Sequence, residues 1–243
     1  MAKVKDYYKV INEAADFSTQ EDWDNSGLLI GNPESEVTAA VVTLDITHEV
    51  IKTAEKLGAN LIISHHPVIF RPIKNVVSGS IPFELVSKSV SAVCCHTPLD
   101  IATGGTNDTL AEILGIQTEV AENPILRIGK ISVTTADEFA RYISEKLGAH
   151  IRYSDAGKPI ETVAICTGSG CSLLDEIDAD AFITGDASHH DFLDFSERGI
   201  SLFAAGHFET ENPVVDTLVK KLKNNFPTDR IFPSQELNPI RYI

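Results

Sequence analysis

A short apolar run ends in two adjacent histidines and a proline in the stretch Leu61-Ile62-Ile63-Ser64-His65-His66-Pro67. The run is typical of a buried strand, and successive side chains of a strand point to opposite faces. One metal ion is therefore not easily bound by both histidines in a regular strand. Where the strand gives way to a loop, each imidazole can serve a different ion, because neutral imidazole is a common transition-metal ligand. The alternative is a solvated histidine pair at a strand end.

Strands and helices alternate on both sides of this stretch. Apolar runs predict buried strands at 39–44, 61–64, 92–95, 162–166, 181–184 and 202–205. Further strands are predicted after a turn within 23–31, at 129–134 and at 151–153. Helical spacing and capping residues predict helices at 4–15, 50–58, 82–89, 106–115, 135–148, 187–199 and 214–222. This alternation predicts an α/β fold with mainly parallel sheets covered by helices, in which ligands collect beyond the carboxyl ends of the strands.

The two halves of the chain resemble each other. Residues 58–64 are similar to residues 178–184, and residues 91–96 match residues 201–207 with one added residue. We therefore expect two α/β repeats, at residues 1–122 and 123–243, with mixed, mainly parallel sheets. Two fused repeats that face each other would bring their strand ends together in one cleft.

Composition excludes several classes of protein. The 243 residues include 43% hydrophobic and 23% charged residues, which is ordinary for a globular protein. The net charge of −15 disfavours a general nucleic-acid or anionic-membrane surface, which needs clustered Lys and Arg. No apolar run approaches membrane-spanning length, and the first residues have no apolar signal region. With only four cysteines, a reduced, cytoplasmic protein is expected.

Polar groups that suit transition metals follow the predicted strands. They are His65, His66, His96, Asp100, His207 and Glu211. Such a set is what two divalent ions require when a carboxylate bridges them, and the imidazoles favour Zn, Fe, Mn, Co or Ni over Mg or Ca. None of these groups belongs to a Cys-x-x-Cys pair, so a structural zinc ribbon is excluded. The alternative is that each histidine is hydrogen-bonded separately in its own loop.

Several motifs together resemble one known family. They are Trp23-Asp24-Asn25-Ser26-Gly27-Leu28, Ser64-His65-His66-Pro67, His96-Thr97-x-x-Asp100, Gly104-Gly105-x-Asn107 and His207-x-x-Thr210-Glu211. They resemble the NGG-interacting factor three-like proteins, whose members are often named "GTP cyclohydrolase 1 type 2 homolog". The resemblance runs from about Val4 to the C-terminal residues. It implies two intertwined α/β repeats, a dinuclear metal cleft between them and a toroidal homohexamer, in the short form without an inserted domain.

The resemblance also implies roles for individual residues. By position, the metal ligands would be His65, His66, Asp100, His207 and Glu211, with Glu211 bridging the two ions. His96 matches a histidine that lines the site, and we expect it to act as a general acid or base if the protein is a hydrolase.

Two functions remain open at this stage. The first is a metal-dependent hydrolase acting on a nucleotide-like substrate, either as a GTP cyclohydrolase or as a phosphoesterase, because paired metal ions activate water. No P-loop motif is present. Arg71, Lys74 and Arg127 are candidates to meet substrate phosphates, or are solvated surface charges. The second function is a non-catalytic metal-binding or scaffold protein in a hexameric assembly.

Four further features have alternative interpretations. Asp45 and Asp186 could orient metal-bound imidazoles. His189 and His190 could line the cleft or form the polar face of a helix. Trp23 is expected to anchor the first helix to the following strand. In residues 207–211 an extended segment would place Glu209 on the face of His207 and a helical turn would place Glu211 there, and only the resemblance favours Glu211.

Overall fold

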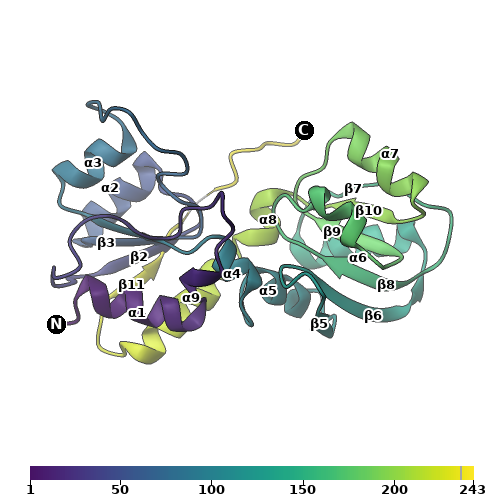
Figure 1. Cartoon of the computed structure of the whole chain (residues 1–243), viewed down its shortest axis with the longest axis horizontal. Helices are drawn as coiled ribbons and strands as arrows, with labels where there is room; N and C mark the ends of the chain where they lie inside the picture. Colours follow the sequence, from purple (N-terminus) through teal and green to yellow (C-terminus); the bar gives the residue numbers. More distant parts are fainter. Residues whose placement is uncertain (236) are drawn as a thin grey trace. The chain divides into compact units, whose positions relative to one another are not determined.

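The computed structural model describes residues 1–235 and 237–243, and contacts divide the chain into two compact units. Unit 1 comprises Met1–Thr103 and Val214–Ile243, and unit 2 comprises Gly104–Pro213. The chain thus leaves unit 1 and later returns to complete it, as the colours of Figure 1 show. The predicted repeats, 1–122 and 123–243, were defined by similarity within the sequence, whereas the two units are defined by contacts in the structure. The repeats therefore stay a prediction.

Unit 1 contains a five-stranded sheet with the order β1-β4-β3-β2-β11. Its strands are β1 (Gly27–Ile30), β2 (Ala40–Thr43), β3 (Leu61–Ser64), β4 (Ser91–Cys94) and β11 (Ile231–Pro233). Strands β4, β3, β2 and β11 pair in parallel, and only β1 is antiparallel to its neighbour. The three central strands are buried along their whole length, which explains why they are continuous apolar runs.

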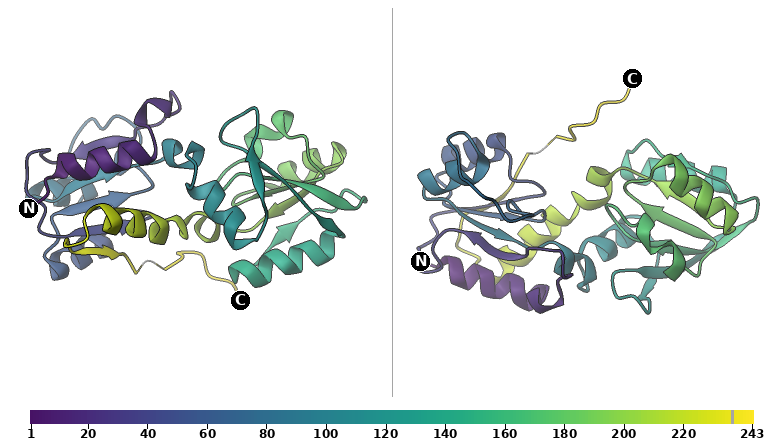
Figure 2. Two further views of the ribbon diagram at one scale, coloured as in Figure 1. Left: turned by 90° about the horizontal axis from the view of Figure 1, so that it is seen from below. Right: turned by 45° about the horizontal axis from the view of Figure 1, so that its top comes forward.

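Helices cover both faces of this sheet. They are α1 (Val4–Ala14), α2 (His48–Leu57), α3 (Ile81–Ser87), α4 (Thr97–Ile101) and α9 (Val214–Asn225), with a short 3-10 turn η1 (Phe17–Thr19). Residues of α2 and α3 form one core cluster with alternate residues of the strands. On the other face α1 lies beside α9 (Figure 2). Tyr7 of α1 stacks on Phe226, which directly follows α9. Helix α2 ends at Leu57. The next residue, Gly58, adopts the left-handed conformation that is typical of a glycine at the C-terminal end of a helix.

Unit 2 contains a six-stranded sheet with the order β5-β6-β8-β9-β10-β7. Its strands are β5 (Thr118–Val120), β6 (Arg127–Thr134), β7 (Arg152–Tyr153), β8 (Ile160–Ile165), β9 (Ala181–Thr184) and β10 (Ser201–Ala204). The pairings of β8 with β9 and of β9 with β10 are parallel. The outer pairings are antiparallel, so the parallel part of this sheet is its centre.

The helices of unit 2 pack on a sheet whose side chains alternate between two cores. They are α5 (Thr106–Ile113), α6 (Ala136–Leu147), α7 (His189–Glu197) and α8 (His207–Glu211), with the 3-10 turn η2 (Cys171–Glu176). Ile183 packs in the core that contains α5 and α6, whereas its neighbour Phe182 packs with α7 and η2. Thr135 and Glu138 form the predicted capping box of α6.

The α/β fold with two mixed sheets is confirmed. In unit 1, Leu61 of β3 pairs with Ser91 of β4, and in unit 2 Ala181 of β9 pairs with Ser201 of β10. These are the segments that the sequence comparison aligned. The short strands β5 and β11 were not predicted.

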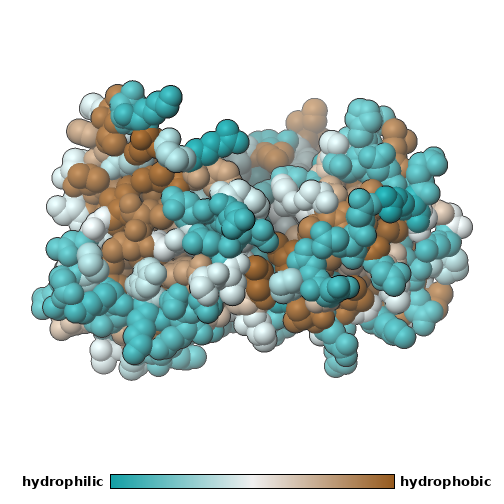
Figure 3. Space-filling model, in the orientation of Figure 1, coloured by the Kyte–Doolittle hydropathy of each residue, from teal (hydrophilic) through white to brown (hydrophobic). Residues whose placement is uncertain are grey.

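The surface carries apolar side chains in some places. Apolar residues (brown in Figure 3) reach the surface of unit 1 around α2 and α3, where Val86 is exposed. Within the described part of the chain, no helix has the length and apolar character needed to cross a membrane.

Candidate metal centre

Three histidines of unit 1 meet where two parallel strands end. Strand β3 ends at Ser64 and its neighbour β4 ends at Cys94, so His65, His66 and His96 follow the same edge of the sheet. The ring centroids of His65 and His96 are 5.2 Å apart, and those of His65 and His66 are 4.9 Å apart. Each ring offers a nitrogen within 4.8 Å of a nitrogen of the other two, which is a spacing that metal ligands can adopt.

One nitrogen of each ring is already bound by an oxygen of unit 1. The Nδ1 atom of His65 lies 3.0 Å from the Cys95 carbonyl oxygen. The Nδ1 atom of His66 lies 2.9 Å from Asp45 Oδ1, as expected for an orienting carboxylate. The Nδ1 atom of His96 lies 2.8 Å from Asp24 Oδ1. Because these oxygens accept hydrogen bonds, the proton is placed on Nδ1 and the lone pair on Nε2, the tautomer that binds a metal through Nε2.

Asp24 contacts the ring of His96, although the sequence motif that contains Asp24 gave it no role of its own. Its side chain is fully buried, and its Oδ2 accepts hydrogen bonds from the Thr97 hydroxyl (2.6 Å) and the Ser26 hydroxyl (3.0 Å). Burial raises the pKa of Asp24, but the hydrogen bonds from His96 and Thr97 lower it further, so the pKa lies well below the usual range. Asp24 therefore remains a carboxylate that fixes the ring of His96. Asp24 lies in a loop and does not follow a predicted strand, so its position in the sequence did not predict this contact.

Asp100 supplies the carboxylate of unit 1. It lies on α4, the short helix that begins directly after His96, and it is buried. Its Oδ1 is 3.6 Å from Nε2 of His65, the nitrogen that does not face Cys95. His65 thus has a fixed Nδ1 on one side and a carboxylate near Nε2 on the other.

Unit 2 repeats this arrangement at the end of β10. Residues 207–211 form the helical turn α8, so Glu211 lies on the same face as His207. The Nε2 atom of His207 is 2.9 Å from Glu211 Oε2, and its Nδ1 is 2.7 Å from Asp186 Oδ2. Burial lowers the pKa of His207, but the two carboxylates outweigh it and raise the pKa to about 9. The positively charged ring is therefore favoured here, between the two carboxylates.

Gly168 and Thr210 hold this turn in place. Thr210 belongs to a motif quoted from the sequence, whereas Gly168 was not singled out there. The Gly168 N–H donates to the Thr210 hydroxyl oxygen at 3.2 Å. Gly168 has a φ of +62°, and a Cβ atom there would lie 2.0 Å from Glu211 Oε1. Only glycine fits this position beside the carboxylate without displacing it.

Some residues singled out in the sequence do not belong to these groups. Arg127 is buried, not solvated, and its guanidinium pairs with Asp108 and donates to the Pro124 carbonyl oxygen at 2.8 Å. It therefore has a structural role and does not present a free charge to a phosphate. Arg71 and Lys74 are exposed. His189 and His190 are the exposed first residues of α7, which agrees with a polar helix face.

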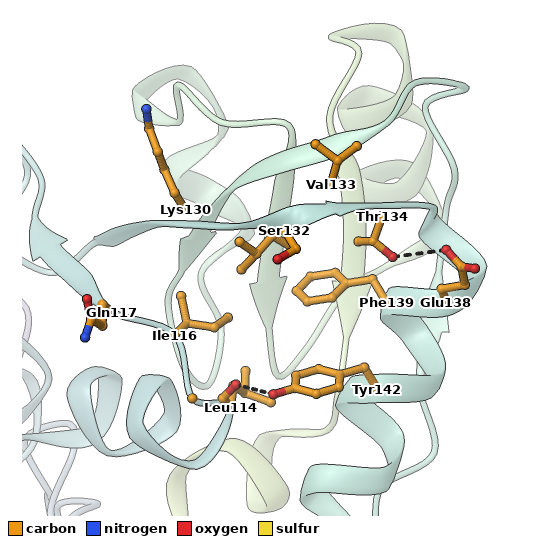
Figure 4. A pocket seen from close by; sticks show the side chains of 12 residues that line it. Leu114, Ile116, Gln117, Lys130, Ser132, Val133, Thr134, Glu138, Phe139 and Tyr142 are labelled. Carbon is orange, nitrogen blue, oxygen red and sulfur yellow. Dashed lines mark hydrogen bonds between the residues drawn. The ribbon is translucent and has the colours of Figure 1, made fainter.

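A separate pocket of about 740 Å³ lies in unit 2, between β6, α6 and the segment after α5. Figure 4 shows its apolar floor, which includes Phe139 and Ile116. Its acidic group, Glu138, belongs to the capping box of α6, and Tyr142 donates to the Leu114 carbonyl oxygen. The residues that line this pocket include no histidine, so the candidate metal ligands lie elsewhere.

Comparisons with known proteins show the family of the chain. A family model described as Duf34/NIF3 (NGG1p interacting factor 3) matches residues 2–239. A "GTP cyclohydrolase 1 type 2 homolog" of Campylobacter jejuni is 35% identical over 99% of both chains. A "GTP cyclohydrolase 1 type 2" of Helicobacter pylori is 32% identical over 87% of this chain and 88% of its own. The crystal structure of Staphylococcus aureus hypothetical protein SA1388 superposes with a TM-score of 0.89 at 28% identity, covering 99% of each chain.

Proposed function

The chain belongs to the Duf34/NIF3 family, and from this premise we propose that it is a metal-dependent hydrolase acting on a nucleotide-like substrate. One observation carries the proposal. In each unit a histidine after a parallel strand has its Nδ1 held by an oxygen and its Nε2 close to a buried carboxylate, in the pairs His65–Asp100 and His207–Glu211. Preorganised imidazoles beside carboxylates are typical of metal ligands rather than of isolated surface histidines.

The proposed ligands are His65, His66, Asp100, His207 and Glu211, with Glu211 bridging. They would hold two divalent transition ions of Zn, Fe, Mn, Co or Ni, because nitrogen-rich donor sets suit these ions better than Mg or Ca. That both units serve the same ions is part of the proposal and follows from the family resemblance. When bound, the ions would supply Lewis acidity and lower the pKa of water.

His96 is the proposed general acid or base. Its Nδ1 is held by Asp24, and its backbone N–H donates to the Ser26 hydroxyl oxygen at 3.0 Å, so ring and backbone are both fixed. Asp24 would stabilise the protonated form of the ring after it accepts a proton. The relatives are named after a GTP cyclohydrolase, and we propose a reaction of that class or the hydrolysis of a phosphoester.

The test is elemental analysis of the purified protein, followed by assays with GTP and a panel of phosphoesters after each candidate metal is restored. The proposal expects bound metal and metal-dependent turnover. His96→Ala should lose turnover while it keeps metal, and parallel loss of both would make His96 a ligand. Bound metal with no turnover on any of these substrates would instead support the non-catalytic scaffold.

Assembly is a separate proposal. The family resemblance implies a toroidal homohexamer. Light scattering during size-exclusion chromatography measures the mass of the assembly directly. A mass of a single chain at assay concentrations would contradict it.

A further inference from the structure

Two exposed aromatic residues flank the ring of His96. Trp23 is 58% exposed and Phe70 is 43% exposed, and their ring centroids are 5.9 Å apart. Both lie beside His96, at 5.8 Å for Trp23 and 6.1 Å for Phe70, and both meet it nearly at right angles. The sequence predicted that Trp23 anchors the first helix to the following strand. Because more than half of its side chain is exposed, Trp23 does not have this role. Large aromatic side chains gain free energy when they leave water, so two together at the surface favour a binding role.

The neighbours of these residues fix them relative to His96. Trp23 directly precedes Asp24, whose buried carboxylate holds His96. Phe70 directly follows Ile69, whose carbonyl oxygen accepts a hydrogen bond from the Asn25 side chain. The two aromatic rings are thus attached to the same hydrogen-bonded network that orients the imidazole. Such a platform is preorganised, which lowers the entropy cost of binding.

We propose that Trp23 and Phe70 bind a planar heteroaromatic ring of the ligand beside His96. This inference rests on the proposed function for the role of the site, but it makes its own claim about which residues recognise the ring. Flat rings stack on aromatic side chains irrespective of their hydrogen-bonding pattern, and loss of one such platform weakens binding by about 10-fold or more. The sugar and phosphate parts of a ligand would not gain from this contact.

Trp23 makes the first experiment direct, because it is the only tryptophan of the chain. Guanosine 5′-monophosphate and ribose 5-phosphate are titrated into the wild-type protein, and tryptophan fluorescence is recorded. The two probes share the ribose and the phosphate, and only the first carries the heteroaromatic ring. We expect the first to change the fluorescence with saturation and the second to leave it unchanged. The inference would be overturned if both probes changed the fluorescence equally, or if neither probe changed it.

Substitutions then separate ring binding from metal binding. Calorimetry with guanosine 5′-monophosphate should give about 10-fold weaker affinity for Trp23→Leu and for Phe70→Leu. Phe83→Leu is the matched control, since Phe83 is 39% exposed in α3 and is not a neighbour of His96. Metal content and light-scattering mass are measured for every variant. The metal content of both site variants should equal that of the wild type.

The failures of the two proposals are distinguishable. If the wild type contains no metal, the proposed hydrolase fails, while the fluorescence titration still decides whether the ring is bound at Trp23. If Trp23→Leu and Phe70→Leu keep both metal and full affinity, the aromatic pair does not bind the ring. If they change the mass of the assembly and leave the affinity unchanged, the pair is a subunit contact and the inference is overturned.

Discussion

His207 has a carboxylate at each of its ring nitrogens, which is unusual for a neutral imidazole. Asp186 lies 2.7 Å from Nδ1 and Glu211 lies 2.9 Å from Nε2, and together they favour a positively charged group. A divalent ion that replaced the proton on Nε2 could be bound by the Nε2 lone pair and by the Glu211 carboxylate. At the scale of the residue, the pair of His207 and Glu211 supplies the groups of unit 2 that could bind a metal ion.

The pair gives a prediction for two neighbouring glutamates. Glu211→Gln should lose one or both metal ions, because an amide is an uncharged and poorer ligand. Glu209→Gln should keep nearly all of its metal, since the helical turn places Glu211 on the face of His207. Elemental analysis of the two variants, purified in parallel, measures the outcome. The reverse order of metal loss would show that the ligand was assigned two residues out of register.

Residue-level predictions from the sequence succeeded where a group follows a strand directly. Asp45 and Asp186 come after β2 and β9, so their meeting with imidazoles at neighbouring strand ends could be expected. Asp24 lies in a loop, and its contact with His96 depends on tertiary folding that spacing does not encode. Arg127 shows the opposite error, because a charged residue in a strand was not expected to be buried.

At the scale of the element, the loop at Gly168 controls the position of α8. Gly168→Ala should cost metal as well as stability, because the new Cβ would lie 2.0 Å from Glu211 Oε1. Gly148→Ala is the matched control: it has a φ of +63° and no atom within 4 Å of the added Cβ. Both variants carry the strain of a left-handed residue, about 1–2 kcal/mol.

Thermal unfolding and elemental analysis separate the two effects. We expect a loss of metal only in Gly168→Ala, and a larger loss of melting temperature in Gly168→Ala than in Gly148→Ala, because the bound metal also stabilises the fold. Full metal content in Gly168→Ala would mean that Glu211 can move without consequence, and that Glu211 is not a ligand.

Asp180 connects the start of β9 to β8 and makes stability depend on pH. Its Oδ2 accepts hydrogen bonds from the Thr162 N–H (2.9 Å) and hydroxyl (2.8 Å), and its Oδ1 is 3.1 Å from Lys158 Nζ. Burial raises the pKa of Asp180, but these hydrogen bonds outweigh it and hold the pKa well below the usual range. The ionised form is thus favoured in the folded state, which stabilises the fold above the unfolded pKa of about 3.9.

Asp180→Asn should therefore lower the free energy of unfolding by about 1–2 kcal/mol at neutral pH. The difference from the wild type should shrink as the pH falls below about 4, where the wild-type carboxylate begins to lose its advantage. Urea unfolding at several pH values measures it. Asp175→Asn is the control, because Asp175 is 80% exposed and its pairing with Arg198 should contribute little. A difference that does not depend on pH would assign the effect to packing.

The sequence predicted the central elements better than the edges of the sheets. Strands β3 and β9 and the capped helices α2 and α6 agree with their local patterns, because propensity, periodicity and capping favour the same structure there. Strand β11 has three residues and pairs with β2, which is distant in the sequence, so only tertiary contact defines it. The sequence does not distinguish the helical turn of α8 from an extended segment, because five residues carry too little periodicity.

At the scale of the whole molecule, the proposed ligands are divided between the two units. His65, His66 and Asp100 belong to unit 1, and His207 and Glu211 belong to unit 2. Each unit has its own sheet and core, so each can bury its apolar side chains without metal. Buried carboxylates and imidazoles remain costly in both, and an ion that binds only the folded state offsets this cost.

Metal removal should therefore lower the melting temperature of the wild-type protein. An ion present at 100 times its dissociation constant stabilises the folded state by about 2.7 kcal/mol, which for a chain of this length corresponds to about 5–10 °C. Calorimetry before and after chelation, with elemental analysis of both samples, measures the shift, and about two ions per chain should be removed. Glu211→Gln serves as the control: having lost metal already, it should respond much less to the chelator. Acid should have the same effect, because protons compete with the ions for the imidazole nitrogens and the carboxylates. Full occupancy at pH ~4, or a melting temperature that chelation leaves unchanged although the metal is gone, would contradict histidine ligation coupled to folding.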